Sequence, residues 1–338
     1  MPSSSAEASA TSRPVLSVVV PVYGCQPCLE HLHERIGATL HGLVSYELIL
    51  VDDRAEDGAW PEIQRLVRLD PAVRGIRLSR NFGQHAAITA GISRTRGEWI
   101  VVMDCDLQDP PEDIPRLYAK ALEGNDIVFG RRTHKPTGRT RRALASLYFR
   151  CLRIFTGTHL EGQYGTFSII SRKVADALMQ LRDQDRHYLM MLAWLGFDTA
   201  AVDYDPAVRY RGRSSYSLPR LIQHAVDGVF FQTTVLLRWI VYLGFFLAGA
   251  GGLLAAYFLI ARLAGHAYPG WTSIVDVTLV LSGFIILSTG ITGLYIGRVF
   301  EQTRGRPVFV IDSVAESDLT PAPSIRTSER VGAGTSGF

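Results

Sequence analysis

The sequence predicts an α/β fold, in which a doubly wound, mostly parallel sheet is followed by an interface helix and two transmembrane helices. Three observations predict it: short apolar runs that stop abruptly at polar residues, helix-like segments between these runs, and two long apolar stretches after about residue 225. Strands that alternate with helices are typical of parallel sheets buried on both faces. Residues 1–14 are rich in Ser and Ala, lack the apolar segment of a signal peptide, and are expected to form a disordered leader.

The α/β domain is expected to occupy residues 15–215, with strands marked by the apolar runs at 15–20, 47–51, 99–103 and 126–129. The helix-like segments lie at 29–40, 60–69, 84–93 and 114–122. In a parallel sheet, ligands bind beyond the carboxyl ends of the strands. The polar residues that follow those ends are Tyr23, the pair Asp52 and Asp53, and the pair Asp104 and Asp106. The predicted topology therefore places a binding site there.

Two apolar stretches, 233–262 and 274–297, each have the roughly twenty residues that a membrane span requires. Buried core helices are the alternative. The flanking arginines, Arg220 on one side and Arg298 and Arg304 on the other, place both flanks in the cytoplasm by the positive-inside rule. We therefore expect a multi-pass protein of the inner (cytoplasmic) membrane, with the α/β domain on the cytoplasmic side.

The segments around the two spans complete the predicted organisation. Residues 216–232 have apolar positions at helical spacing and are expected to form an amphipathic helix in the membrane interface, with an ordinary packing helix as the alternative. Residues 298–312 are expected to form a cytosolic strand or hairpin, with the strand at 307–311, and 313–338 a disordered tail. The small residues Gly244, Gly249, Gly251 and Gly252 permit close packing of the spans or a homo-oligomer.

The charge and the cysteines exclude two classes of protein. A net charge of +3 over 338 residues, without a long basic run, does not support nucleic-acid binding. The four cysteines, at positions 25, 28, 105 and 151, lack the spacing of a disulfide framework, which favours a reducing compartment. Cys25 and Cys28 have the spacing of a redox motif, but a single copy favours packing over a thiol or metal role.

Asp104-Cys105-Asp106 delivers two carboxylates to the end of a predicted strand. Such triplets are common in solvated turns, but here a buried strand comes before, and a second acidic pair, Asp52-Asp53, follows a neighbouring strand. Oxygen ligands suit hard cations that also bridge to a diphosphate. The sequence therefore predicts a Mg²⁺ or Mn²⁺ site.

Four strings of the sequence resemble a known family: VVVPVY at 18–23, LILVDD at 48–53, LSRNFGQHAAITAG at 78–91 and MDCDLQDPPE at 103–112. They look like family 2 glycosyltransferases, in the branch of dolichol-phosphate mannose synthases and bacterial polyprenyl-phosphate glucosyltransferases. The resemblance runs from about residue 15 to 311. It implies a GT-A fold and a metal-dependent, inverting transfer of a hexose, glucose or mannose in type, from a UDP- or GDP-sugar to a polyprenyl phosphate such as undecaprenyl phosphate.

The resemblance also implies roles for individual residues. Those expected to line the nucleotide are Pro21, Tyr23, Asp52, Asp53, Asn81 and Gln84. Asp104 and Asp106 are the implied catalytic pair and hold the metal, with help from Gln108. For Asn81 and Gln84, helix capping and simple surface exposure are the alternative.

A cationic patch follows the predicted strand at 126–129, and its members are Arg131, Arg132, Arg139, Arg141, Arg142 and Ser146. A solvated basic face is the usual interpretation of such a run. However, Arg142 and Ser146 fall one helical turn apart, and guanidinium groups match phosphate oxygens. The resemblance implies that Arg132, Arg142 and Ser146 bind the acceptor phosphate.

The chain departs from the family pattern where many relatives have Gly-Asp-Phe-Arg-Leu. Here the sequence is Gly165-Thr166-Phe167-Ser168-Ile169, so a general base cannot be assigned at Thr166. Two alternatives therefore stay open beside the polyprenyl phosphate transferase. One is a glycosyltransferase acting on another lipid or on a glycan, and the other is a non-catalytic membrane scaffold with a nucleotide-sugar fold. The sequence does not identify the sugar or the pathway.

Overall fold

The computed structural model describes residues 13–133, 164–184, 186–207, 235–264 and 270–317. The chain divides into two compact units. The first consists of Met1–Pro136, Glu161–Arg213 and Pro307–Phe338, and the second of Thr137–Leu160 and Ser214–Arg306. The predicted interface helix at 216–232 lies outside the described residues.

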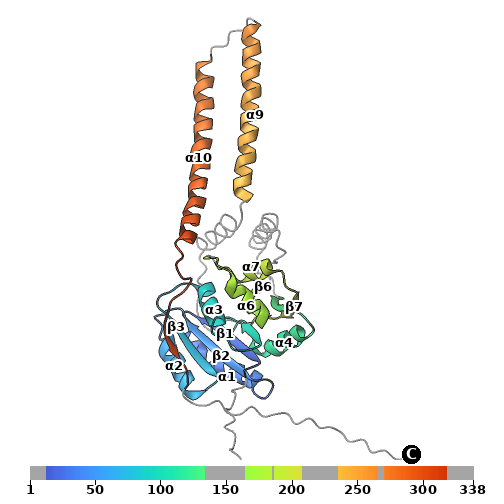
Figure 1. Ribbon diagram of the computed structural model, residues 1–338, viewed down its shortest axis with the longest axis vertical. Helices are drawn as coiled ribbons and strands as arrows, with labels where there is room; N and C mark the ends of the chain where they lie inside the picture. Colours follow the sequence, from blue (N-terminus) through green and yellow to red (C-terminus); the bar gives the residue numbers. More distant parts are fainter. Residues whose placement is uncertain (1–12, 134–163, 185, 208–234, 265–269, 318–338) are drawn as a thin grey trace, which may run out of the picture. The chain divides into compact units, whose positions relative to one another are not determined.

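The first unit is built on an eight-stranded sheet with the strand order β7-β5-β6-β4-β1-β2-β3-β8 (Figure 1). The strands are β1 (Leu16–Val22), β2 (Tyr46–Asp52), β3 (Val73–Leu78), β4 (Trp99–Val102), β5 (Ile127–Arg132), β6 (Tyr164–Ser171), β7 (Thr199–Tyr204) and β8 (Ile311–Ala315). The four strands predicted from apolar runs correspond to β1, β2, β4 and β5. The α/β class is therefore confirmed.

The sheet is mixed, with a parallel majority of four pairs among the described strands, so the prediction of a mostly parallel sheet holds only narrowly. The pairs β1–β2, β1–β4, β2–β3 and β5–β7 are parallel. The pairs β3–β8, β4–β6 and β5–β6 are antiparallel. The physical reason is that β6 inserts between β4 and β5, and β8 returns to the far edge, so neither joins the sheet through a parallel crossover.

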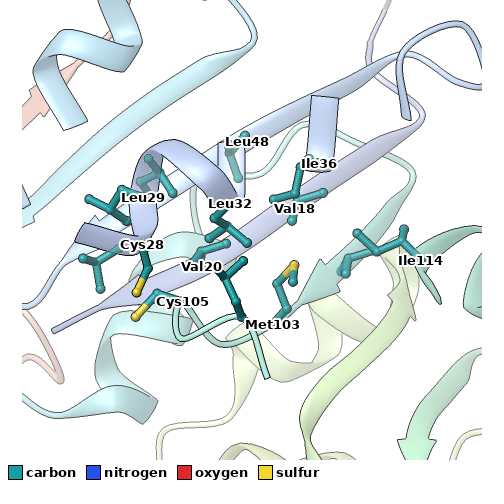
Figure 2. Packing of buried hydrophobic residues seen from close by; sticks show 14 of the residues in the cluster. Val18, Val20, Cys28, Leu29, Leu32, Ile36, Leu48, Met103, Cys105 and Ile114 are labelled. Carbon is teal, nitrogen blue, oxygen red and sulfur yellow. The ribbon is translucent and has the colours of Figure 1, made fainter. Parts of the chain in front are cut away.

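Helices cover both faces of the sheet, because successive side chains of a strand point to opposite faces. On one face, α1 (Leu29–Leu40), α2 (Ala59–Leu69) and α4 (Ile114–Leu122) bury their apolar positions against Val18 and Val20 (Figure 2). On the other, α3 (Gln84–Ile92), α6 (Arg172–Gln180) and α7 (Tyr188–Leu195) pack against Val19 and its neighbours. Short 3-10 helices, η1 (Gln26–Cys28) and η2 (Pro111–Asp113), precede α1 and α4. The sheet is thus doubly wound.

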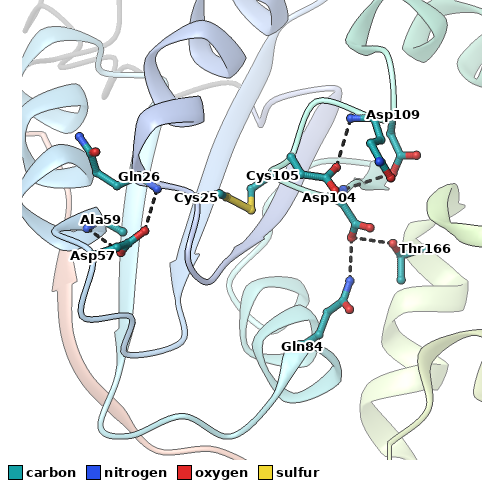
Figure 3. The surroundings of a disulfide bond; sticks show 11 residues. Cys25, Gln26, Asp57, Ala59, Gln84, Asp104, Cys105, Asp109 and Thr166 are labelled. Carbon is teal, nitrogen blue, oxygen red and sulfur yellow. Dashed lines mark hydrogen bonds between the residues drawn. A yellow bond between two sulfur atoms is a disulfide. The ribbon is translucent and has the colours of Figure 1, made fainter. Parts of the chain in front are cut away.

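A disulfide joins Cys25 to Cys105 across 80 residues of sequence (Figure 3). The prediction of four reduced cysteines is therefore wrong, and the cysteines no longer support a reducing compartment. Sequence spacing gave no signal, because the pairing depends on the ends of β1 and β4, which become neighbours only in the sheet. Cys28 lies buried near the same place and is not part of the disulfide.

The second unit contains α9 (Val235–Leu263) and α10 (Trp271–Thr303), where the sequence predicted two membrane spans. The helical state of both segments is confirmed. Many of their apolar side chains are exposed, among them Phe245, Leu253 and Ile286. Among the residues that the structure describes, however, no helix combines the length and the apolar character needed to cross a membrane.

The strand predicted at 307–311 is found slightly further along the chain, as β8 at Ile311–Ala315. It therefore extends into the segment that was predicted to be disordered from residue 313. It pairs with β3, and an ion pair between Arg74 and Glu316 lies beside it. The edge of β3 supplies unpaired backbone groups, and Ile311 and Ala315 pack against the core, which together explain why this segment becomes a strand.

Candidate active site

The loop after β1 carries two of the predicted nucleotide residues. Pro21 is buried within β1, in register with Val51 of β2. A proline is tolerated there because the pairing of β1 with β4 ends at Val19 and Val102, so no β4 carbonyl lacks its donor. Tyr23 follows the strand and is 61% exposed, as a residue that stacks on a ligand must be.

Asp52 ends β2 and is fully buried. Its Oδ1 accepts a hydrogen bond from the Ala55 backbone at 3.0 Å, and its Oδ2 lies 3.1 Å from Nε of Arg77. Burial raises the pKa of the Asp52 carboxyl, although the Ala55 N–H and Arg77 act against this rise. Asp52 therefore shapes the turn beside the site, and its role in lining the nucleotide stays a prediction.

Asp53 holds the loop that follows β3. Its Oδ1 accepts from the backbone N–H of Phe82 at 2.7 Å, and its Oδ2 from that of Gly83 at 2.8 Å. Gly83 precedes α3 with φ 95°, a left-handed value that favours glycine. Asp53 thus fixes the start of α3 and, with it, the position of Gln84.

Asp104 lies at the centre of the site, where side chains from two other elements meet it (Figure 3). Nε2 of Gln84 donates to its Oδ1 at 2.7 Å, and the hydroxyl of Thr166, on β6, donates to the same oxygen at 2.8 Å. Gln84 therefore contacts the acidic pair, while its expected role at the nucleotide stays a prediction. Thr166, which stands where many relatives have an acidic residue, acts as a hydrogen-bond donor to the carboxylate.

The electrostatics around Asp104 fit a bound cation. Burial raises the pKa of its carboxyl to about 7, and the Asp109 carboxylate adds to the rise, whereas the Thr166 hydroxyl and Arg132 lower it. Crowded carboxylates repel one another, and a divalent cation with oxygen preference would relieve that repulsion. The donor set of Asp104 and Asp106 therefore suits Mg²⁺ or Mn²⁺.

The turn from Asp106 to Gln108 has a strained backbone. Leu107 has φ 62°, which is uncommon for a residue with a side chain. The Gln108 N–H donates to Oδ1 of Asp106 at 3.1 Å and closes the turn. In the part of the chain that the structure describes, no three His, Cys, Asp or Glu side chains form a metal-binding group. Asp104 and Asp106 would thus supply two carboxylates, with Gln108 as an amide ligand.

A buried network connects Asp109, Arg132 and Tyr204. Nη2 of Arg132 donates to Oδ1 of Asp109 at 3.0 Å, and its Nε donates to the Tyr204 hydroxyl at 2.8 Å. The Tyr204 hydroxyl in turn donates to Oδ1 of Asp109 at 2.5 Å. Burial and the Asp109 carboxylate raise the pKa of Tyr204, so the phenol stays protonated at neutral pH.

The structure brings most of the predicted residues to one edge of the sheet, but not all of them are tested. Asn81 is exposed, and it does not cap α3, whose N-cap is Gly83 without a side-chain bond. Four members of the cationic patch lie outside the described residues, so their roles stay predictions: Arg139, Arg141, Arg142 and Ser146.

The sequence did not single out Asp109 and Tyr204 as site residues. Asp109 stands in the MDCDLQDPPE string without an assigned role, and Tyr204 ends an edge strand that gave no sequence signal.

Residues 17–179 match the family described as Glycosyl transferase family 2. The glycosyltransferase YkcC of Bacillus subtilis is 32% identical over 299 residues, which cover 87% of this chain and 92% of the relative. The undecaprenyl-phosphate 4-deoxy-4-formamido-L-arabinose transferase of Pseudomonas paraeruginosa is 33% identical over 315 residues, which cover 92% and 93%. Both likenesses extend over nearly the whole length of each protein.

Among solved structures, the mannosyltransferase PcManGT of Pyrobaculum calidifontis has a TM-score of 0.41 at 17% identity, covering 88% of this chain and 89% of its own. The glucosyl-3-phosphoglycerate synthase of Mycobacterium tuberculosis has a TM-score of 0.46 at 20% identity, covering 64% and 76%. At these values the fold is better described by its own strand order than by either likeness.

Proposed function

The chain belongs to glycosyl transferase family 2, and from this premise we propose that it transfers a hexose from a UDP- or GDP-sugar to a polyprenyl phosphate. That the chain is a glycosyltransferase follows from the family match and the full-length relatives. The acceptor class is suggested by the relative named as an undecaprenyl-phosphate transferase. That relative's sugar is a modified arabinose, so the proposal takes from it only the acceptor and not the sugar.

One observation carries the proposal: Asp109 lies between the acidic pair and Arg132. Its Oδ1 accepts from Nη2 of Arg132 at 3.0 Å, and its Oδ2 lies 3.4 Å from the backbone N of Asp104. The groups that suit a cation and a diphosphate therefore adjoin a guanidinium that suits a second phosphate. Transfer from a nucleotide diphosphate to a lipid phosphate requires this arrangement of two anionic reactants.

The chemistry needs little covalent help from the protein. A phosphate monoester has a second pKa of about 6, so the acceptor is largely dianionic at neutral pH. One of its oxygens attacks the anomeric carbon, the bond from that carbon to the nucleotide diphosphate breaks, and the diphosphate leaves with the electron pair. A bound Mg²⁺ or Mn²⁺ would neutralise charge on the leaving diphosphate. A single displacement inverts the anomeric centre, so an α-linked donor gives a β-linked product without a general base.

The chain's own residues position the reactants. Tyr23 would stack on the nucleotide base from the loop after β1, while Asp53 and Gln84 hold the start of α3 against Asp104. Arg132 would bind the acceptor phosphate and stabilise the charge that passes from acceptor to leaving group. The GT-A label and the roles of Arg142 and Ser146 belong to the same proposal.

The proposal includes work at a membrane, because the acceptor is a lipid, and on its cytoplasmic side, in line with the flanking arginines and the positive-inside rule. The exposed apolar side chains of α9 and α10 support it, since large apolar side chains exposed in such numbers usually contact lipid or protein. Fractionation of cells that express the tagged full-length chain tests this part. Recovery in the soluble fraction after a high-speed spin would contradict it.

The deciding experiment is a transfer assay with the purified full-length protein in detergent. Undecaprenyl phosphate, Mg²⁺ or Mn²⁺, and a panel of labelled UDP- and GDP-sugars are incubated together, and label is measured in the organic phase. Asp106→Asn is expected to lose at least a hundredfold in rate. Asp176→Asn is the matched control, because its carboxylate forms only a long, exposed contact with Arg172 at 4.0 Å.

Label that requires the lipid, the metal and Asp106 identifies both the reaction and the donor. Label that appears on another lipid or on a glycan moves the assignment to the alternative acceptor classes. If no donor gives lipid-linked label while nucleotide binding is retained, the transferase proposal is wrong, and the scaffold becomes the better description.

A further inference from the structure

We propose that Tyr204 and Asp109 are positioning residues for the acceptor, which hold the guanidinium of Arg132 in the orientation that receives the acceptor phosphate. This inference rests on the proposed function, in which Arg132 contacts that phosphate. It assigns a task to two buried residues that the sequence did not single out. Neither of them is expected to touch a substrate.

Arg132 contacts two buried partners, although its own side chain is partly exposed. Asp109 is 0% exposed and Tyr204 is 2% exposed, whereas the Arg132 side chain is 32% exposed. The two contacts use Nε and Nη2 of the guanidinium. Because the guanidinium is planar and carries its donors in a fixed fork, fixing one edge also fixes the direction of the other. The Nη1 edge is then the one presented to a phosphate.

The side chain of Tyr204 is tightly packed. Its ring lies edge-to-face on Phe167, with centroids 5.3 Å apart. A Cβ at Gly130 would lie 2.7 Å from the Phe167 ring and 2.9 Å from the Tyr204 ring, so only glycine fits between them. A Cβ at Gly165 would stand 3.4 Å from Nη2 of Arg132. Gly130 therefore leaves room for the two rings, Gly165 adjoins the guanidinium at ordinary contact distance, and the phenol hydroxyl has a fixed position.

The Arg132–Tyr204 pair differs from the neighbouring Arg131–Asp203 pair on the same two strands. Arg131 pairs in register with Asp203, and Arg132 with Tyr204. The outward pair, Arg131 and Asp203, forms an ion pair with 38% and 50% of the side chains exposed, and its Nη2–Oδ2 distance is 2.9 Å. An exposed pair of this kind contributes little to stability. The inward pair lies at the next register position, with Tyr204 buried and Arg132 bonded to Asp109 of the acidic loop, and this difference separates positioning from simple strand pairing.

Asp109 also connects the two reactant sites. Its Oδ1 receives Arg132 and Tyr204, while its Oδ2 lies 3.4 Å from the backbone N of Asp104. One carboxylate thus fixes the acceptor arginine relative to the loop that would hold the donor diphosphate. Removing the Tyr204 hydroxyl should disturb the acceptor side of this arrangement, since that hydroxyl contacts Arg132 and Asp109 but does not contact Asp104.

Steady-state kinetics with the full-length protein in detergent test the inference. Undecaprenyl phosphate is varied at saturating donor for wild type, Tyr204→Phe, Arg132→Lys and the double variant, and the Kd of the nucleotide diphosphate is measured by calorimetry. Tyr204→Phe is expected to raise the acceptor KM about tenfold while the nucleotide Kd changes less than twofold. Asp203→Asn, the matched control on the neighbouring position, is expected to leave both the acceptor KM and the nucleotide Kd within twofold of wild type.

The double variant gives the readout that a purely structural role would not produce. If Tyr204 acts through Arg132, then Tyr204→Phe should have less than a twofold further effect in the Arg132→Lys background, because lysine lacks the fork that the tyrosine orients. Asp109→Asn should raise the acceptor KM further than Tyr204→Phe. Should Asp109→Asn fail to fold, the Tyr204 cycle decides alone.

Two results would overturn the inference while leaving the proposed function standing. One is a multiplicative effect of the two substitutions, and the other is a Tyr204→Phe variant whose nucleotide Kd rises as much as its acceptor KM. A wild-type protein that transfers no sugar to the lipid instead overturns the proposed function, and the inference with it. The two failures are therefore distinguished by the wild-type rate alone.

Discussion

At the scale of single residues, the Asp104 carboxyl has the most unusual environment in the site. It is held by Gln84 and Thr166 on one oxygen, and it lies close enough to Asp109 for the two carboxyls to repel. A carboxyl whose pKa is raised to about 7 is partly protonated at neutral pH when no cation is bound. Protons and metal ions therefore compete for Asp104 in the physiological range.

This competition predicts a pH dependence of metal binding. A raised pKa favours the protonated form, so the metal must displace a proton below about pH 7 and meets a free carboxylate above it. We expect the Mn²⁺ affinity, measured by calorimetry in the presence of nucleoside diphosphate, to fall about tenfold per pH unit between pH 6.5 and 5.5, and to level off above pH 8. An affinity that is flat over that range would contradict either the raised pKa of Asp104 or its role as a ligand.

Replacing Thr166 by valine should weaken the binding of the metal ion at Asp104. The substitution keeps the shape of the side chain but removes the donor at 2.8 Å from the Asp104 oxygen. A hydrogen bond to a charged group contributes about 1.5–3 kcal/mol, so the Mn²⁺ affinity at pH 7 should drop roughly tenfold or more. Thr166→Ser retains the hydroxyl and serves as the control. Equal affinities for the valine and serine variants would contradict the role given to Thr166.

The sequence predicted the acidic pair, the nucleotide loop and Arg132, but not the network that holds them. Asp104 and Asp106 could be recognised because they are adjacent in the chain and follow an apolar strand. Tyr204 and Asp109 are 95 residues apart, and they meet only because β7 adds to the sheet beside β5. No local pattern reports such a contact, and the same holds for the disulfide between Cys25 and Cys105.

At the scale of secondary-structure elements, the helices were more predictable than the strands. The predicted segments 29–40, 60–69, 84–93 and 114–122 agree with α1, α2, α3 and α4 to within a residue at each end. Each of these segments has enough apolar positions to identify it without knowledge of its partners. The strands β3, β6 and β7 were missed, because β3 carries two arginines and a glycine among its six residues, β6 begins with the polar and small residues of the site, and β7 is a half-exposed edge strand. The helices α6 and α7 were missed as well.

The fit of α3 against the sheet depends on Gly91. A Cβ at this position would lie 2.3 Å from Cγ1 of Val19 and 3.1 Å from Cγ2 of Val51. Overpacking of this kind costs about 1–3 kcal/mol, which outweighs the gain of about 1 kcal/mol from replacing glycine by alanine in a helix. Gly91→Ala should therefore lower the free energy of unfolding by about 1–2 kcal/mol, as measured by urea denaturation.

Gly37 in α1 is the matched control for this prediction. A Cβ there would meet only the Tyr46 hydroxyl, at an ordinary contact distance of 3.6 Å. Gly37→Ala should therefore raise the free energy of unfolding by about 0.5–1 kcal/mol, through the helix propensity of alanine alone. If both substitutions shifted stability in the same direction, the close packing of α3 on β1 and β2 would be in error.

At the scale of the whole molecule, the disulfide joins the two loops on which the site depends. Cys25 follows β1, in the loop that carries Tyr23, and Cys105 lies between Asp104 and Asp106 (Figure 3). The bond closes a loop of 80 residues in sequence separation, which includes β2, β3, α3 and β4. It thereby limits how far the loop after β1 and the acidic loop can separate in the unfolded chain.

Reduction should consequently destabilise the protein. In the chain-entropy description, a crosslink over a loop of this length contributes about 4 kcal/mol, and measured values are usually smaller. We expect dithiothreitol to lower the free energy of unfolding of the wild type by about 2–4 kcal/mol in urea denaturation. The stability of Cys25→Ser should not respond to dithiothreitol. A wild type that is equally stable with and without reductant would show that the bond is not formed in the protein as purified.

The position of β8 at the edge of β3 has a consequence for the order in which the protein is made. The other strands of the sheet have all been synthesised by residue 204, but β8 follows α9 and α10 in the chain. At typical translation rates, about ten seconds separate the emergence of β7 from that of β8. Throughout that interval the nascent chain carries an open strand edge at β3, the kind of edge that pairs with other chains. Of the strands in this sheet, β8 is thus the last to be synthesised, after both long helices.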